Sequence, residues 1–87
     1  MAMVRIPSLL RDLTGGLDRI SVEAETVGEA IAALDRLYPG MQARLCEGGI
    51  LRPSLIVVVD GQVRPKKLRQ PLLPSSEVIF LPAISGG

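Results

Sequence analysis

Apolar and polar residues alternate along two segments near the start of the chain. Residues 3–6 alternate weakly before Pro7, and residues 19–25 alternate well, with Ile20, Val22 and Ala24 on one face. Period-two alternation is typical of a strand that is buried on one side. Residues 14–16, Thr-Gly-Gly, are typical of a turn. The pattern therefore predicts a hairpin with a long loop.

Helical spacing replaces this alternation in the next segment. Thr26 and Glu29 match a capping box, in which the Thr26 hydroxyl accepts the Glu29 amide and the Glu29 carboxylate accepts the Thr26 amide. Pro39 disfavours helical geometry at residue 38 and so ends the helix. The apolar stripe predicts an amphipathic helix over residues 27–37. Its members are Val27, Ala30, Ile31, Leu34 and Leu37.

Shorter elements follow. Residues 41–47 predict a second helix with Met41 and Leu45 inward, ended by the glycines at 48 and 49. Residues 55–59 form an aliphatic run typical of a strand buried on both faces. Residues 60–61, Asp-Gly, predict a hairpin turn into a short strand at 62–64. Residues 65–76 read as irregular, and 77–81 as the last strand. We expect Ile56 and Val58 to pack under the helix with Ile20 and Val22.

This order of elements predicts one α+β domain, because a single amphipathic helix can cover only one face of a four- or five-stranded sheet. Apolar residues make up 47% of the chain and aromatic residues 2%, so the core must be aliphatic. The formal net charge of +1 gives no reason to expect nucleic acid or an anionic membrane as a partner. No apolar run is long enough to span a bilayer, and we expect a cytoplasmic protein.

The residues available for chemistry are few. The chain has no histidine and one cysteine, Cys46, so it offers neither an internal disulfide nor the commonest metal ligand and general base. Glu23, Glu25 and Glu29 supply only oxygen ligands on an exposed edge, which makes a metal site improbable. We therefore expect neither an enzyme nor a bound metal or cofactor.

The chain ends in Gly86-Gly87. Glycine has no Cβ, so two in a row form a thin tip that can enter a narrow tunnel in a partner. Residues 78–81 lead into it as a strand-like segment, followed by residues 82–85, Pro-Ala-Ile-Ser. We expect residues 1–84 to form the domain and residues 85–87 to form a flexible diglycine tail.

The ending at residues 79–87, Ile-Phe-Leu-Pro-Ala-Ile-Ser-Gly-Gly, resembles that of the MoaD/ThiS family of ubiquitin-like sulfur carriers. The opening at residues 4–11, with the turn at 14–16, is most similar to the CysO-type branch. The capped helix and the strand ending Val59-Asp60-Gly61 also fit. The resemblance covers nearly the whole chain. It implies a β-grasp (ubiquitin-like) fold with a mixed sheet of four to five strands and one main helix.

The resemblance also implies a mechanism. An E1-like enzyme would use ATP to adenylate the Gly87 carboxylate, and sulfur would replace AMP to leave a thiocarboxylate. A sulfur-accepting synthase, cysteine-synthase-like or thiosugar-synthase-like, would then receive the tail. A molybdopterin synthase small subunit uses the same tail. Two other classes of protein are alternatives to a sulfur carrier. One is a ubiquitin-like modifier that is joined to lysines of target proteins, and the other is a plain interaction module.

Further residues are candidates for contact with these partners. Ser85 and Ile84 would accompany Gly86 into the partner as tail contacts or as a spacer. Phe80 reads equally well as an aromatic anchor at an interface and as a core residue. One positive cluster would dock an acidic surface of the activating enzyme or would be a solvated loop; it comprises Arg64, Lys66, Lys67 and Arg69.

Overall fold

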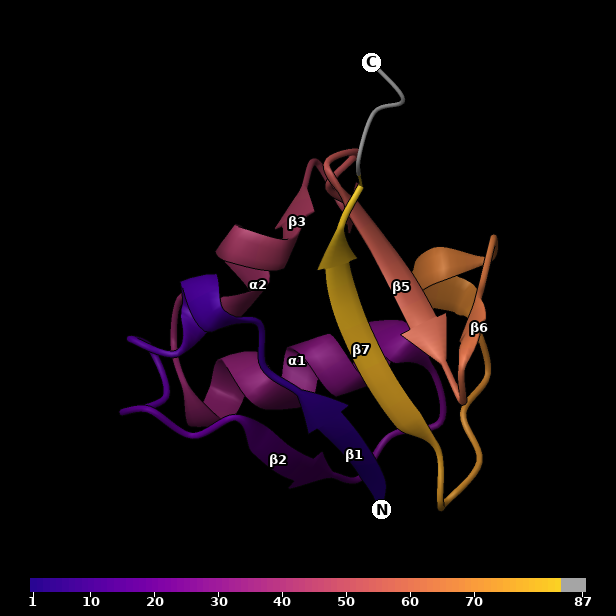
Figure 1. Cartoon of the computed structure of the whole chain (residues 1–87), viewed down its shortest axis with the longest axis horizontal. Helices are drawn as coiled ribbons and strands as arrows, with labels where there is room; N and C mark the ends of the chain where they lie inside the picture. The colour runs from indigo at the N-terminus through magenta and orange to yellow at the C-terminus, as the bar shows by residue number, and fades with distance from the viewer. Residues whose placement is uncertain (84–87) are drawn as a thin grey trace.

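The computed structural model describes residues 1–83. The expected domain boundary at residue 84 and the tail at 85–87 lie outside these residues. Five strands form one mixed sheet in the order β2-β1-β7-β5-β6 (Figure 1). Strands β1 and β7 are parallel, and the other neighbours are antiparallel. The strands span Ala2–Arg5 (β1), Arg19–Val22 (β2), Leu55–Val59 (β5), Gln62–Val63 (β6) and Glu77–Pro82 (β7).

The helix α1 spans Val27–Leu37, as predicted, and lies across one face of the sheet. Thr26 is its N-cap, since the Thr26 hydroxyl accepts the Glu29 amide at 3.1 Å. The second half of the expected capping box is wrong by one residue, because the Glu29 carboxylate accepts the amide of Glu25 at 3.1 Å. Thr26 itself forms an isolated bridge with Pro71, so the segment entering the helix is held by pairing that the local motif does not encode.

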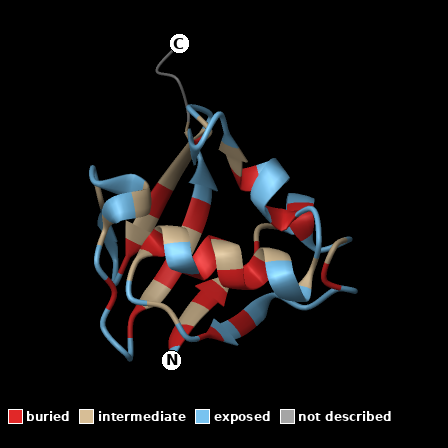
Figure 2. Ribbon diagram, turned by 180° about the vertical axis from the view of Figure 1, so that it is seen from behind, coloured by how far each residue is buried: buried red, intermediate tan, exposed pale blue. Residues whose placement is uncertain are grey.

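The core lies between α1 and the strands beneath it (Figure 2). The predicted core residues Val27, Ile31 and Leu34 are buried, as are Ile20 and Val22 of β2. From the sheet, the core also takes Val4, Val57, Val59, Val78 and Phe80.

Two expectations about the core are wrong. Ile56 and Val58 are only half-buried and face away from α1, whereas Val57 and Val59 point toward it. Every residue of β5 is aliphatic, so the sequence does not mark which face is inward. Leu37 is 58% exposed, because it lies in the last turn of α1 at an open depression beside β2.

The connecting segments contain elements that periodicity did not predict. The short helix α2 (Met41–Leu45) buries Met41 and Leu45 as expected, but it is followed by a hairpin of β3 (Cys46–Glu47) and β4 (Ile50–Leu51). Gly48 and Gly49 form its turn with φ of 63° and 82°, values that favour glycine. Two 3-10 turns, η1 (Ser8–Leu10) and η2 (Lys67–Arg69), complete the chain.

The predicted Asp60-Gly61 turn is confirmed, with φ of 51° and 84° at its two residues. Positive φ at both positions is typical of the turn that best fits the twist of a two-residue hairpin. Strand β2 ends at Val22, earlier than the alternation predicts, because the chain leaves the sheet there to reach α1. Within residues 1–83, no helix combines the length and the apolar content needed to cross a membrane.

Candidate functional site

The central strand β7 carries the chain toward the diglycine tail. β7 is paired along both edges, with β1 on one side and β5 on the other. Its last residue, Pro82, lies opposite Leu55, and the amide of Ala83 still donates to the Ser54 carbonyl at 2.7 Å. The base of the tail is therefore held by the sheet up to Ala83. The predicted site residues Ile84, Ser85, Gly86 and Gly87 lie outside the described residues.

The sheet face opposite α1, here called the open face, is turned toward the viewer in Figure 1. On β7, Ile79 and Leu81 point to this face while Val78 and Phe80 point to the core. The register places Ile79 opposite Val58 and Leu81 opposite Ile56. Ile56, Val58 and Ile79 are half-buried, and Val63 and Leu81 are exposed. A contiguous apolar patch that is open to solvent is typical of an interaction surface. We call them the apolar stripe: Ile56, Val58, Val63, Ile79 and Leu81.

Two arginines border the apolar stripe on one side of the same face. Arg5 of β1 lies opposite Ile79 on one side and Arg19 of β2 on the other. Within residues 1–83 neither arginine forms an ion pair. Like charges directly opposite one another destabilise an antiparallel pair, and a partner carboxylate between them would relieve this repulsion.

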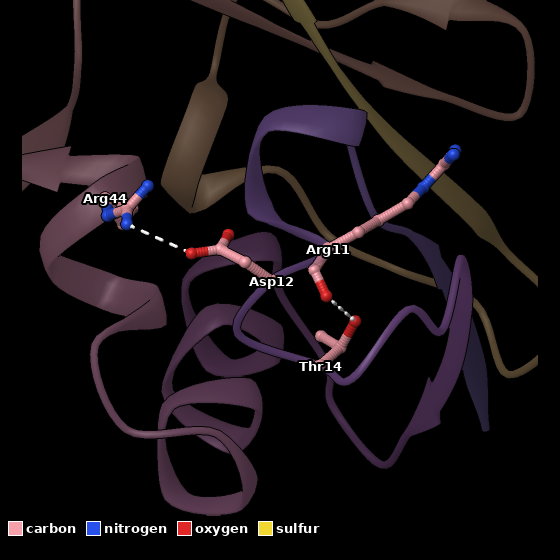
Figure 3. A network of polar contacts seen from close by, with 4 residues as sticks. All are labelled: Arg11, Asp12, Thr14 and Arg44. Carbon is pink, nitrogen blue, oxygen red and sulfur yellow. Dashed lines mark hydrogen bonds and ion pairs between the residues drawn. The ribbon is translucent and has the colours of Figure 1, made fainter.

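The loop after β1 is held in place next to the base of the tail. The buried Thr14 hydroxyl lies within hydrogen-bond distance of two carbonyl acceptors, that of Leu17 at 2.8 Å and that of Arg11 at 3.1 Å. Asp12 pairs with Arg44 at 3.6 Å, and Figure 3 shows this ion pair beside the Thr14–Arg11 contact. The Arg11 side chain points away from that ion pair. The loop forms one wall of a 240 Å³ cleft whose other wall contains Ser54, the residue that holds Ala83. Leu9 lines this cleft and is 79% exposed.

The predicted positive cluster lies on and around η2. Lys66, Lys67 and Arg69 are exposed, whereas Arg64 is half-buried. The Nε atom of Arg64 is buried without a hydrogen-bond partner among the described residues. None of the four forms an ion pair within residues 1–83. The structure thus brings the exposed cations together and leaves their charge unneutralised.

The single thiol shows no sign of activation. Cys46 is half-buried in β3. Burial raises the pKa of the Cys46 thiol, and the smaller opposing effect of the nearby Arg52 charge does not offset this. A raised pKa leaves less of the nucleophilic thiolate at neutral pH. Among residues 1–83 no three side chains of the metal-binding types lie close enough together to hold a metal ion.

Comparison with known proteins places this geometry in a family. The ThiS family model matches residues 4–87. The chain belongs to the ThiS family. The sulfur carrier protein CysO of Mycobacterium tuberculosis is 35% identical, over 97% of this chain and 96% of the relative. A chain in the crystal structure of the Amycolatopsis orientalis BexX/CysO complex superposes with a TM-score of 0.91 at 28% identity, covering 100% of both chains.

The small archaeal modifier protein 1 of Methanosarcina acetivorans is a more distant structural neighbour. It superposes with a TM-score of 0.81 at 25% identity, over 99% of this chain and 95% of that one. Together these findings agree with the predicted family, the β-grasp fold and the sulfur-carrier class. In Amycolatopsis orientalis, a carrier of this class forms a complex with another protein, BexX.

One predicted contact residue of this ThiS-family chain has to be corrected. Phe80 is only 2% exposed and packs in the core, so its ring cannot act as an aromatic anchor on the surface. Its neighbours Ile79 and Leu81 take the surface position instead. Sequence analysis missed them, although alternation along residues 77–82 means that burial of Phe80 places Leu81 on the opposite face.

Proposed function

We propose that the chain is a sulfur carrier whose Gly87 carboxylate is adenylated by an E1-like enzyme and converted to a thiocarboxylate. The ThiS-family match through residue 87 and the similarity to the mycobacterial sulfur carrier support this role. The chain is a protein co-substrate, and its partner uses ATP and supplies the catalytic groups. A cytoplasmic setting suits a protein with one cysteine, since thiols stay reduced there.

The chemistry needs activation before sulfur can enter. The Gly87 carboxylate attacks the α-phosphorus of ATP, diphosphate leaves, and an acyl-adenylate forms. Sulfide then attacks the acyl carbon and AMP leaves, which yields the thiocarboxylate; a persulfide donor would need a reducing thiol to give the same product. The thiocarboxylate is a tethered sulfur nucleophile for a second enzyme.

The length of chain after Ala83 limits where the partner's active site can lie. Ala83 is fixed to Ser54, and four residues follow it. Four fully extended residues span at most about 14 Å. An active site that receives Gly87 must therefore lie within about 14 Å of Ala83. The partner that contains it has to contact the surface around the end of β7.

The open face is the surface that such a partner would meet. Its apolar stripe ends at Leu81, two residues before Ala83, and Arg5 and Arg19 border the stripe on the side of β1 and β2. We expect the partner to offer an apolar patch bordered by carboxylates, because complementary charge orients and accelerates docking. For the sulfur-accepting enzyme, we favour a cysteine-synthase-like protein and keep a thiosugar-synthase-like protein as the alternative.

The test is conversion of the tail in vitro. The chain is incubated with a cognate E1-like adenylating enzyme, ATP and a sulfur donor, and intact-mass measurement should show one oxygen exchanged for one sulfur. The product should react with an alkylating reagent even in Cys46→Ser. Deletion of Gly87 should abolish conversion without unfolding the domain, and Gly86→Val should impair it by blocking the tunnel.

Two results would redirect the proposal. Equal thiolation of the Gly87 deletion and the full chain would refute it. Adducts on lysines of other proteins would instead favour a modifier, the role named for the archaeal neighbour. Alkylation at about pH 6 identifies a thiocarboxylate at Gly87. At that pH the raised pKa of Cys46 keeps the Cys46 thiol protonated and unreactive, whereas a thiocarboxylate is ionised and reacts.

A further inference from the structure

A second surface lies away from the open face, between the β3–β4 hairpin and η2. The two elements enclose a cleft of about 440 Å³. Its apolar lining comes from Ile50, Leu51, Pro65 and Leu68, and its charged lining from Lys66, Lys67 and Arg69. Among residues 1–83, no carboxylate lines it. We call it the basic cleft.

The basic cleft combines apolar surface with uncompensated positive charge. Ile50 is 61% exposed, although it belongs to a strand. Within residues 1–83 the three cations of the lining have no ion-pair partner. A solvated loop would explain the lysines alone, but it does not explain why an isoleucine stays exposed beside them.

The walls of the basic cleft are built to hold their positions. Lys67 adopts φ of 53°, a left-handed conformation that is strained for a residue with a Cβ. Gly28 allows η2 to approach α1, since a Cβ at residue 28 would come within 3.2 Å of the Leu68 carbonyl. The opposite wall is the hairpin whose turn is formed by Gly48 and Gly49. A pre-formed cleft lowers the ordering cost of binding.

The basic cleft is also within reach of an enzyme that holds the tail. Ile50 precedes Ser54 by four residues, so the two are at most about 14 Å apart along an extended chain. Ser54 holds Ala83 at the base of the tail. One partner can therefore contact the end of β7 and the basic cleft at the same time.

We propose that the basic cleft docks an acidic peptide segment with a central apolar side chain, supplied by an enzyme that receives the tail. The apolar side chain inserts beside Ile50 and Leu68, and flanking carboxylates pair with Lys66, Lys67 and Arg69. The cleft would select among enzymes that all fit a diglycine tip. This identification of the partner's chemistry rests on the proposed function, but binding of the segment to the chain does not require thiolation.

The test uses short synthetic peptides and the full chain labelled with ¹⁵N. The first peptide has glutamates on both sides of one leucine; one sister peptide has serine for leucine, and another has glutamines for the glutamates. The first peptide should cause saturable shifts in the amides of Ile50, Leu51 and Leu68 and of residues 66–69. Both sister peptides should bind more weakly.

Charge-reversed variants separate the basic cleft from general attraction. Lys66→Glu should weaken binding of the first peptide about fivefold, a loss in the range of the interaction energies of exposed charge pairs. Arg36→Glu, an equal change of charge in the exposed last turn of α1, should leave affinity unchanged. Lys67→Gly removes charge at a backbone conformation that glycine adopts readily, and it should weaken binding without loss of fold.

Lysine labelling gives a second readout on the intact complex. Lys66 and Lys67 are the only lysines of the chain. An amine-reactive reagent labels the N-terminal amine as well, so mass mapping of the labelled peptides is used to read the label on the two lysines of the basic cleft. The adenylating enzyme should protect both from labelling. No saturable peptide shift, shifts confined to other surfaces, equal binding of the serine peptide, or equal weakening by Lys66→Glu and Arg36→Glu would overturn the proposal.

The two proposals fail separately. Peptide binding without thiolation of Gly87 would keep the basic cleft and refute the carrier role. Thiolation of Gly87 without peptide binding at the basic cleft would do the reverse.

Discussion

The two faces of the sheet are built from the same strands but have opposite surroundings. The face under α1 is closed, and its residues Val57, Val78 and Phe80 are at most 2% exposed. On β5 and β7 the open face carries side chains of the same apolar type, which no helix or strand within residues 1–83 covers, and Leu81 there is 42% exposed. On β5, and at residues 78–81 of β7, the chemical nature of the side chains therefore does not distinguish the two faces. There, what distinguishes them is the helix that covers one face.

This difference separates stability from recognition along a single strand. On β7, the residues that pack in the core, Val78 and Phe80, are each followed by a residue that points to the open face. The apolar surface of the closed face is already removed from water by the chain itself. The apolar surface of the open face is still hydrated, so covering it with a partner is favourable in free energy. Because β7 leads into the tail, the uncovered face lies where a partner must approach. Substitutions at adjacent positions of β7 should therefore have different consequences.

The largest difference is expected between Phe80→Ala and Leu81→Ala. Phe80→Ala should lower the free energy of unfolding by about 3–5 kcal/mol, because it leaves a cavity under α1. Leu81→Ala should change it by no more than about 0.5–1 kcal/mol, as is usual on a surface. Urea denaturation of both variants measures these values.

Association should rank the same pair in the opposite order. Leu81→Ala should weaken binding to the adenylating enzyme about five- to thirtyfold, the effect of losing about 1–2 kcal/mol at an interface. Phe80→Ala, measured below its melting temperature, should bind nearly as well as the unmodified chain. If Leu81→Ala binds normally, the open face is not the docking surface.

A smaller effect is expected at the cap of α1, which belongs to the closed side alone. Thr26→Ala should cost about 0.5–2 kcal/mol of stability by removing the acceptor for the Glu29 amide. Thr26→Ser keeps that acceptor and should retain most of the stability, which urea denaturation can check. Thiolation of folded Thr26→Ala should be unchanged. A thiolation defect would show that the closed side also takes part in recognition.

Local signals explain which parts of the fold could be predicted from sequence. The bounds of α1, the Asp60-Gly61 turn and the positions of the sheet strands along the chain follow from capping, spacing and turn chemistry within a few residues. The order of those strands in the sheet was expected only from the family resemblance. The inward face of β5 could not be predicted, because it depends on the register with β7 and every residue of β5 is aliphatic. The β3–β4 hairpin escaped prediction since strands of two residues show no period.

The candidate site divides in the same way. The tail stays a prediction from its contiguous motif, whereas the positive cluster could be predicted because it is a run in the sequence. The apolar stripe joins three strands, and the basic cleft joins a hairpin to a 3-10 turn. Each depends on contacts between distant segments. Phe80 was ambiguous for the same reason, since only the register shows on which face its ring lies.

Methyl NMR of the chain with its adenylating enzyme tests most directly whether the open face delivers the tail. Isoleucine, leucine and valine methyl groups occur on both faces, so one spectrum compares them. On addition of the enzyme, the methyl signals of Ile56, Val58, Ile79 and Leu81 should shift or broaden, while those of Val57, Val59 and Val78 should stay unchanged. Unchanged signals from the open face, in a sample whose Gly87 is thiolated to completion, would contradict this account of docking.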